Sequence, residues 1–102
     1  MPASAVSVPT QREVNSITKK LTPDVVRIRF SESKDYAGDP ALYFRVLLAD
    51  ESAQGPEKRN RLMSKVRYAL TTGLSLEELE ETVVFRCRTV GEQLADPNPD
   101  WD

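Results

Sequence analysis

The chain contains no histidine and only one cysteine, Cys87, among its 102 residues. Histidine is the commonest general base and a common metal ligand, so its absence argues against the usual hydrolytic and metal-dependent enzymes. A single cysteine allows no internal disulfide and fits a reducing compartment. Glycine-rich phosphate-binding motifs are missing as well. We therefore expect a protein that works without catalysis, metal or cofactor.

Long apolar segments are also absent. No apolar run approaches the roughly 18 residues that a membrane helix needs. Residues 1–9 lack the basic start and the apolar stretch of a signal peptide. A chain of 102 residues supports one modest core. These features predict a single cytoplasmic domain without membrane contact.

Charge is distributed unevenly along the chain. Residues 1–76 hold 12 Lys and Arg against 8 Asp and Glu, whereas residues 77–102 hold 2 against 8. The net charge is −2, so the whole molecule is not strongly attracted to nucleic acid. The pattern indicates a mildly basic body followed by a strongly acidic last quarter.

Helical periodicity and capping signals predict three helices. Thr10 to Glu13 form a capping box before a helix over about 10–21, which Pro23 ends. A second helix begins near Pro56 and stops at Gly73. A second capping box, Ser75 to Glu78, predicts a short helix over about 76–81 after a kink at Gly73.

Three segments alternate as strands do, over 24–31, 41–49 and 82–89. Their apolar sets are Val26, Ile28 and Phe30; Leu42, Phe44, Val46 and Leu48; and Val83, Phe85 and Cys87. The predicted order is α-β-β-α-α-β, an α+β two-layer sandwich with a three-stranded sheet and helices on one face. We expect a flexible arm over 1–9, one α+β domain over 10–90 and an acidic extended tail over 91–102.

The faces opposite these apolar sets are rich in arginine. They carry Arg27, Arg29, Tyr43, Arg45, Arg86 and Arg88. Like charges on adjacent strands repel, so this face costs stability unless something negative lies close to it. Arginine suits carboxylates and phosphates because its planar fork donates hydrogen bonds in pairs. The pattern predicts a docking surface for an anionic partner, either an acidic protein segment or RNA.

Two alternatives remain open at this stage. In one, the arginines lie over carboxylates of their own chain; the candidates are Asp24, Glu32, Glu92, Asp96, Asp100 and Asp102. In the other, the acidic tail folds back over the sheet and Trp101 stacks on an arginine, as a clasp or a displaceable cover.

Further candidate binding residues lie outside the sheet. Tyr36 in the first loop and Trp101 in the tail are candidate anchors for a protein partner, because aromatic residues dominate interface hot spots. The second predicted helix is basic, and its Lys58, Arg59, Arg61 and Lys65 are the candidates for an alternative role in nucleic-acid binding.

The predicted topology resembles the type II KH fold over about residues 10–90. Thr71-Thr72-Gly73 lies between the paired helices, after a β-hairpin. Within that fold the arrangement is similar to the ribosome-binding factor A family, in which a glycine kink replaces the KH loop. The resemblance implies an RNA- or ribosome-associated domain. The G-x-x-G loop with which KH domains clamp nucleotides is absent, since Gly73 stands alone.

A second pattern runs from Gly38 to Val46 (GDPALYFRV) and continues in Phe85-Arg86, Glu92-Gln93 and Trp101. It resembles small bacterial proteins of unknown function, so it implies a bacterial source but no mechanism. The leading hypothesis is a non-enzymatic protein-interaction module, an accessory, adaptor or antitoxin-like subunit. The alternative is a KH-like RNA-binding domain, and a homodimer is a further expectation.

Overall fold

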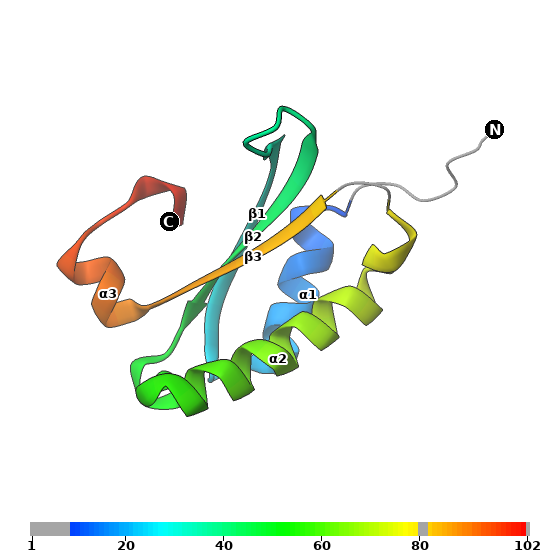
Figure 1. Cartoon of the computed structure of the whole chain (residues 1–102). Coiled ribbons are helices and arrows are strands. Elements are labelled where there is room, and N and C mark those ends of the chain that lie inside the picture. Colours follow the sequence, from blue (N-terminus) through cyan, green and yellow to red (C-terminus); the bar gives the residue numbers. More distant parts are fainter. Residues whose placement is uncertain (1–8, 80–81, 102) are drawn as a thin grey trace.

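A computed structural model describes residues 9–79 and 82–101 (Figure 1). The helices and strands are α1 (Gln11–Leu21), β1 (Val25–Lys34), β2 (Pro40–Leu48), α2 (Gly55–Gly73), β3 (Thr82–Thr89) and α3 (Val90–Ala95). Short 3-10 turns lie at η1 (Asp50–Ala53), η2 (Leu76–Glu78) and η3 (Pro99–Trp101). The sheet order is β1-β2-β3; β1 and β2 are antiparallel, and β2 and β3 are parallel. The predicted α+β class with a three-stranded sheet is confirmed.

Helices α1 and α2 cover the apolar face of the sheet (Figure 1). The predicted capping box at the start of α1 is present, with the Thr10 side chain and Glu13 each accepting from the other's backbone N–H. Phe44 is fully buried at the centre, and its ring stacks on Phe30 at 6.0 Å and on Phe85 at 5.5 Å. A Cβ on Gly73 would lie 2.8 Å from the Ile17 side chain, so this glycine lets the two helices approach closely.

The predicted short helix over 76–81 is wrong for the part that the structure describes. Residues Leu76–Glu78 form a 3-10 turn, and positions 80 and 81 lie outside the described residues. Ser75 makes no side-chain cap; it adopts the left-handed conformation with φ 53°. The backbone N–H of Ser75 donates to the Thr72 carbonyl at 3.4 Å, and its carbonyl accepts from the Glu78 N–H at 3.1 Å, so Ser75 joins the end of α2 to the 3-10 turn.

The inward assignment of Val26 is also wrong. The register of β1 shifts between Val25 and Arg27, which is a β-bulge. A bulge adds one residue to a strand and changes which side chains face the core. Val25 is therefore fully buried, whereas Val26 is 47% exposed.

The tail differs from the prediction of an extended segment. Residues Val90–Ala95 form α3, and Pro99–Trp101 form a further 3-10 turn. The turn Pro99–Trp101 lies on the side of the sheet away from α1 and α2, and α3 leads to it from the end of β3, so the elements of the chain do not all cover one face (Figure 1). The polar face of the sheet is consequently covered at one end.

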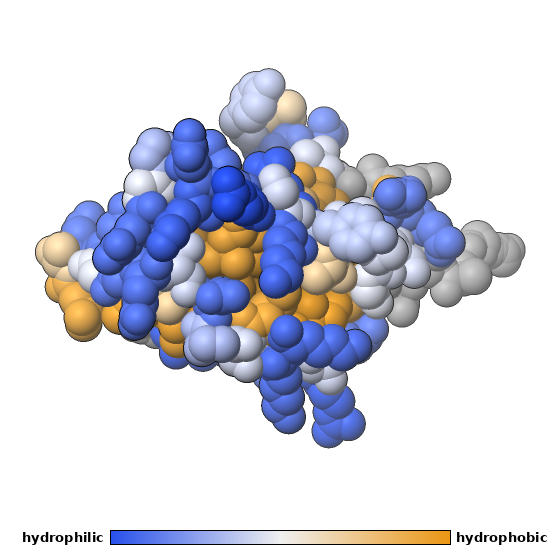
Figure 2. All heavy atoms as spheres, turned by 90° about the horizontal axis from the view of Figure 1, so that it is seen from below, coloured by the Kyte–Doolittle hydropathy of each residue, from blue (hydrophilic) through white to orange (hydrophobic). Residues whose placement is uncertain are grey.

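The surface on the α2 side is mixed. Hydrophilic side chains surround a central area of hydrophobic ones (Figure 2). Several hydrophobic side chains are only partly buried at the margin of the core: Phe30, Ala69, Leu79, Val83, Phe85 and Cys87. Within the ranges that the structure describes, no helix is both long enough and apolar enough to cross a membrane.

Candidate functional site

Three successive cross-strand rows on the face of the sheet opposite the core carry its predicted arginines and Tyr43. The residues of each row, taken from β1, β2 and β3, are Ser31-Tyr43-Val84, Arg29-Arg45-Arg86 and Arg27-Leu47-Arg88. We name the second the arginine row and the third the covered row. The five arginines that the sequence predicted on this face therefore do lie together, on three adjacent strands.

The arginine row has few internal partners. Arg45 donates to the Ser31 hydroxyl at 3.0 Å, and its guanidinium lies 5.7 Å from the centre of the Tyr43 ring. Arg29 and Arg86 are exposed, and the side chain of neither forms a hydrogen bond or an ion pair with residues 9–79 or 82–101. Three cations in direct register repel one another, because like charges opposite each other on neighbouring strands destabilise a sheet.

The covered row lies under the end of the tail. Trp101 is only 7% exposed, and its ring centre lies 5.8 Å from the guanidinium of Arg88. Arg27 donates to the Trp101 carbonyl at 3.1 Å, while its Nε is buried without a hydrogen-bond partner. Leu47 is 5% exposed although it belongs to the polar face. The tail thus forms a clasp, as in the second alternative considered from the sequence.

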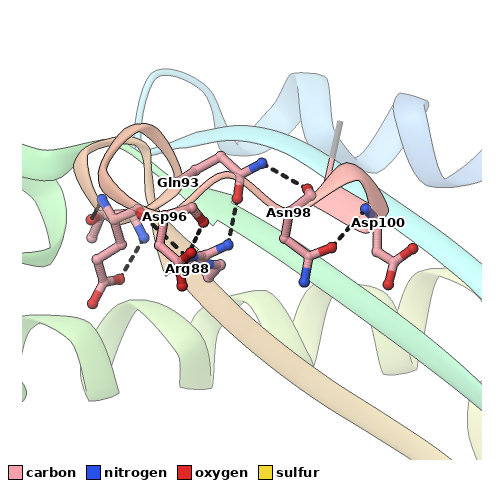
Figure 3. A network of polar contacts seen from close by, with 7 residues as sticks. Arg88, Gln93, Asp96, Asn98 and Asp100 are labelled. Carbon is pink, nitrogen blue, oxygen red and sulfur yellow. Dashed lines mark hydrogen bonds and ion pairs between the residues drawn. The ribbon is translucent and has the colours of Figure 1, made fainter.

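Arg88 is the polar centre of this clasp (Figure 3). Its guanidinium donates to Gln93 Oε1 at 2.5 Å, to the Asp96 carbonyl at 2.8 Å and to the Glu92 carbonyl at 3.1 Å. The Asp96 carboxylate adds an ion pair at 3.9 Å. Gln93 in turn donates to the Asn98 carbonyl at 2.8 Å. Charge-assisted bonds of this kind are the stronger ones, and they fix the path of the tail.

The base of the tail is attached to the rest of the domain. Thr89 and Glu92 form a capping box at the start of α3, and Glu92 also pairs with Arg59 of α2 at 3.0 Å. The hydrogen bond from the Thr89 backbone and the neighbouring Arg59 hold the pKa of Glu92 below its ordinary value, against a smaller opposing effect of burial. The Asp50 carboxylate accepts from the Gly91 N–H at 2.9 Å.

The remaining predicted binding residues are dispersed. Tyr36 lies in the β1–β2 connection and is fully exposed, while the Tyr43 hydroxyl donates to the Lys34 carbonyl at 3.3 Å. On α2, three of the four predicted cations line a hollow of about 390 Å³, whose residues are Asp24, Glu51, Ser52, Lys58, Arg61, Leu62 and Lys65. Two carboxylates share this hollow, so it is not uniformly basic. Arg59 lies elsewhere, beside Glu92.

Cys87 belongs to the inner side of β3 and is half-buried. Burial raises the pKa of its thiol, and the nearby charges of Arg59 and Arg67 oppose this only in part. A raised pKa leaves less thiolate at neutral pH, so the thiol is a weak nucleophile. Within residues 9–79 and 82–101, no group of three His, Cys, Asp or Glu side chains is placed to hold a metal.

Reasoning from the sequence missed two parts of the site. Leu47 and Gln93 become important only because the tail folds over β2 and β3, which no local pattern encodes. The start of α3 did have a signal. Thr89-Val90-Gly91-Glu92 is the same Thr-x-x-Glu pattern that starts α1 at Thr10.

Comparisons of the chain with protein-family models, with curated proteins and with solved structures found no match. The candidate site therefore rests on its own geometry: a clasped end and an adjacent row of three arginines.

Proposed function

We propose that this domain works by binding, as a non-enzymatic interaction module whose arginine row docks an acidic segment of another protein. The observation that carries the proposal is the register of Arg29, Arg45 and Arg86 across three strands, with no carboxylate of residues 9–79 or 82–101 in ion-pair contact. An anionic ligand would remove the repulsion within the row, so binding and stability would gain together.

The tail supports an acidic protein segment as the ligand class. It is itself acidic, and it binds the neighbouring row through an aromatic ring, backbone carbonyls and one carboxylate. Those are the groups that a protein segment offers and that a nucleic-acid backbone lacks. The covered row therefore illustrates, within one chain, the contacts that such a ligand would make beside it.

The test is affinity purification of the tagged full chain from its source cells, with and without nuclease. It compares the wild type with a triple variant, Arg29→Gln, Arg45→Gln and Arg86→Gln. We expect a stoichiometric protein that survives nuclease and is lost in this variant. The matched control is Lys58→Gln, Arg61→Gln and Lys65→Gln, which removes the same charge from α2 and keeps the capture. Capture unaffected by the arginine variant would refute the proposal.

The second candidate function is a KH-like, RNA- or ribosome-associated domain. The three cations that share the α2 hollow favour it. For this function the capture would be lost on nuclease treatment, would weaken steeply with added salt because phosphate contacts release counterions, and would fail in the α2 variant.

A further inference from the structure

The backbone groups at the two edges of the sheet differ in their hydrogen-bond partners. On β1, the Gln11 side-chain amide bonds to the edge as a neighbouring strand would. Its Nε2 donates to the Ile28 carbonyl at 2.8 Å, and its Oε1 accepts from the Phe30 N–H at 3.4 Å. The bulge between Val25 and Arg27 interrupts the same strand. Bulges and covering groups are the ordinary means of preventing an edge from pairing with another chain.

The outer edge of β3 has no such protection. From Thr82 to Arg88, no described residue other than those of β2 forms a hydrogen bond with the backbone of this strand. The strand has 8 residues and contains neither proline nor glycine. Alternate backbone N–H and C=O groups along it therefore have no hydrogen-bond partner among residues 9–79 and 82–101, which makes the edge a template for another strand.

Side chains beside this edge are also incompletely covered. Val83, Phe85 and Cys87 point toward the core but are only partly buried, whereas Phe44 on the central strand is fully buried. A strand added beside β3 would place its own side chains over them, because side chains of paired strands lie next to one another on each face.

The charges beside β3 indicate which kind of strand would bind at its free edge. Arg86 is exposed on the polar face, and Arg67 of α2 lies 5.7 Å from the centre of the Phe85 ring on the other face. An acidic segment complements these cations. Pairing of β3 with β3 of a second copy would instead bring Arg86 and Arg88 of both copies to one interface, and like charges there destabilise pairing.

We propose that the acidic partner segment binds as a fourth strand on the free edge of β3, an inference that rests on the proposed function above. Side chains of a strand alternate between faces, so such a segment alternates acidic and apolar residues. Its acids lie on the polar face beside Arg86, the member of the arginine row that borders this edge, and its apolar side chains cover Val83, Phe85 and Cys87.

The experiment uses the ¹⁵N-labelled full chain and an eight-residue peptide that alternates Glu and Val. We expect every second amide of β3 to exchange with solvent about tenfold more slowly when about nine-tenths of the chain is bound. Alkylation of Cys87 by iodoacetamide slows as well. A peptide with Lys in place of Glu controls for charge, and the amides of β1, next to Gln11, control for location.

Two further peptides keep every side chain and carry N-methyl groups at alternate residues, one peptide in each phase. In one phase the methyl groups replace the donors that face β3, so binding is lost; in the other they point to solvent, so binding is kept. Equal binding in both phases, or arginine-dependent binding without protection of β3, would overturn the fourth strand and leave the proposed function standing. If the Glu and Lys peptides bind equally, both proposals fail. If the Glu peptide does not bind, the fourth strand is refuted, and the capture experiment decides the proposed function.

Discussion

The covered row and the arginine row lie side by side on one sheet, yet Arg88 in the first and Arg29 and Arg86 in the second have very different surroundings. Arg88 donates three hydrogen bonds to the tail and stacks on Trp101, so its charge is matched by acceptors. Arg29 and Arg86, one row away, have no such partners among the residues that the structure describes. The comparison shows that the sign of a surface arginine's contribution to stability is decided by what lies next to it.

The largest expected effect comes from removing the apolar centre of the covered row. Leu47→Ala removes a buried side chain between Arg27 and Arg88 and should lower the free energy of unfolding by about 2–4 kcal/mol, as for other buried leucines. Urea denaturation measures the loss. Val84→Ala, on the same face but outside the covered row, serves as the control and should cost less. Equal losses would show that the tail does not seal this row.

The next largest effect is expected from replacing one arginine in each row and comparing the two variants. Arg88→Gln removes the donors that hold the tail and should cost about 1–3 kcal/mol. Trp101 is the only tryptophan, so its fluorescence reports the clasp alone, and its emission should move to longer wavelength as the ring meets water. Arg29→Gln, the matched change in the arginine row, should leave the emission unchanged. An unchanged spectrum in Arg88→Gln would contradict the clasp.

A smaller effect of opposite sign is expected in the arginine row. Arg86→Gln relieves repulsion with Arg45, its direct neighbour on β2, and should raise the free energy of unfolding by about 0.2–1 kcal/mol. The melting temperature of the variant in low salt measures the gain. Added salt should reduce it, because screening already weakens the repulsion in the wild type. A loss of stability would mean that Arg86 has a favourable partner.

The smallest expected effect is on the stability of the clasp at low pH. The Thr89 backbone and Arg59 favour the ionised form of Glu92, so folding lowers its pKa from an ordinary value of 4.5. A lowered pKa adds stability above pH 4.5, and this contribution is lost as the pH falls through the lowered value. Trp101 emission should therefore shift below pH 4.5 more in the wild type than in Glu92→Gln. Identical titrations would exclude Glu92 from the clasp.

The sequence predicted the strands and the shared polar face well, because a period of two is a local signal. It placed β3 at 82–89, as observed, and brought Arg29, Arg45 and Arg86 to one face. It failed at Val26, because a bulge changes the phase of a strand without changing its composition.

Capping patterns were less informative than periodicity. Thr10, Ser75 and Thr89 all begin a Ser/Thr-x-x-Glu pattern, yet only Thr10 and Thr89 cap a helix. Ser75 lies two residues after the end of α2 and takes the left-handed conformation there, and only the 3-10 turn Leu76–Glu78 follows it. The return of Trp101 to Arg27 and Arg88 depends on contacts between distant residues, which no local pattern predicts.

The Gln11 amide on β1 has a consequence for assembly. A sheet with two open edges can add strands at both and grow into a filament, whereas this sheet has one edge occupied by its own side chain. The domain therefore has only one sheet edge, that of β3, at which a further strand can add. A complex built on β3 therefore extends this sheet from one side only, because Gln11 occupies backbone groups on the other.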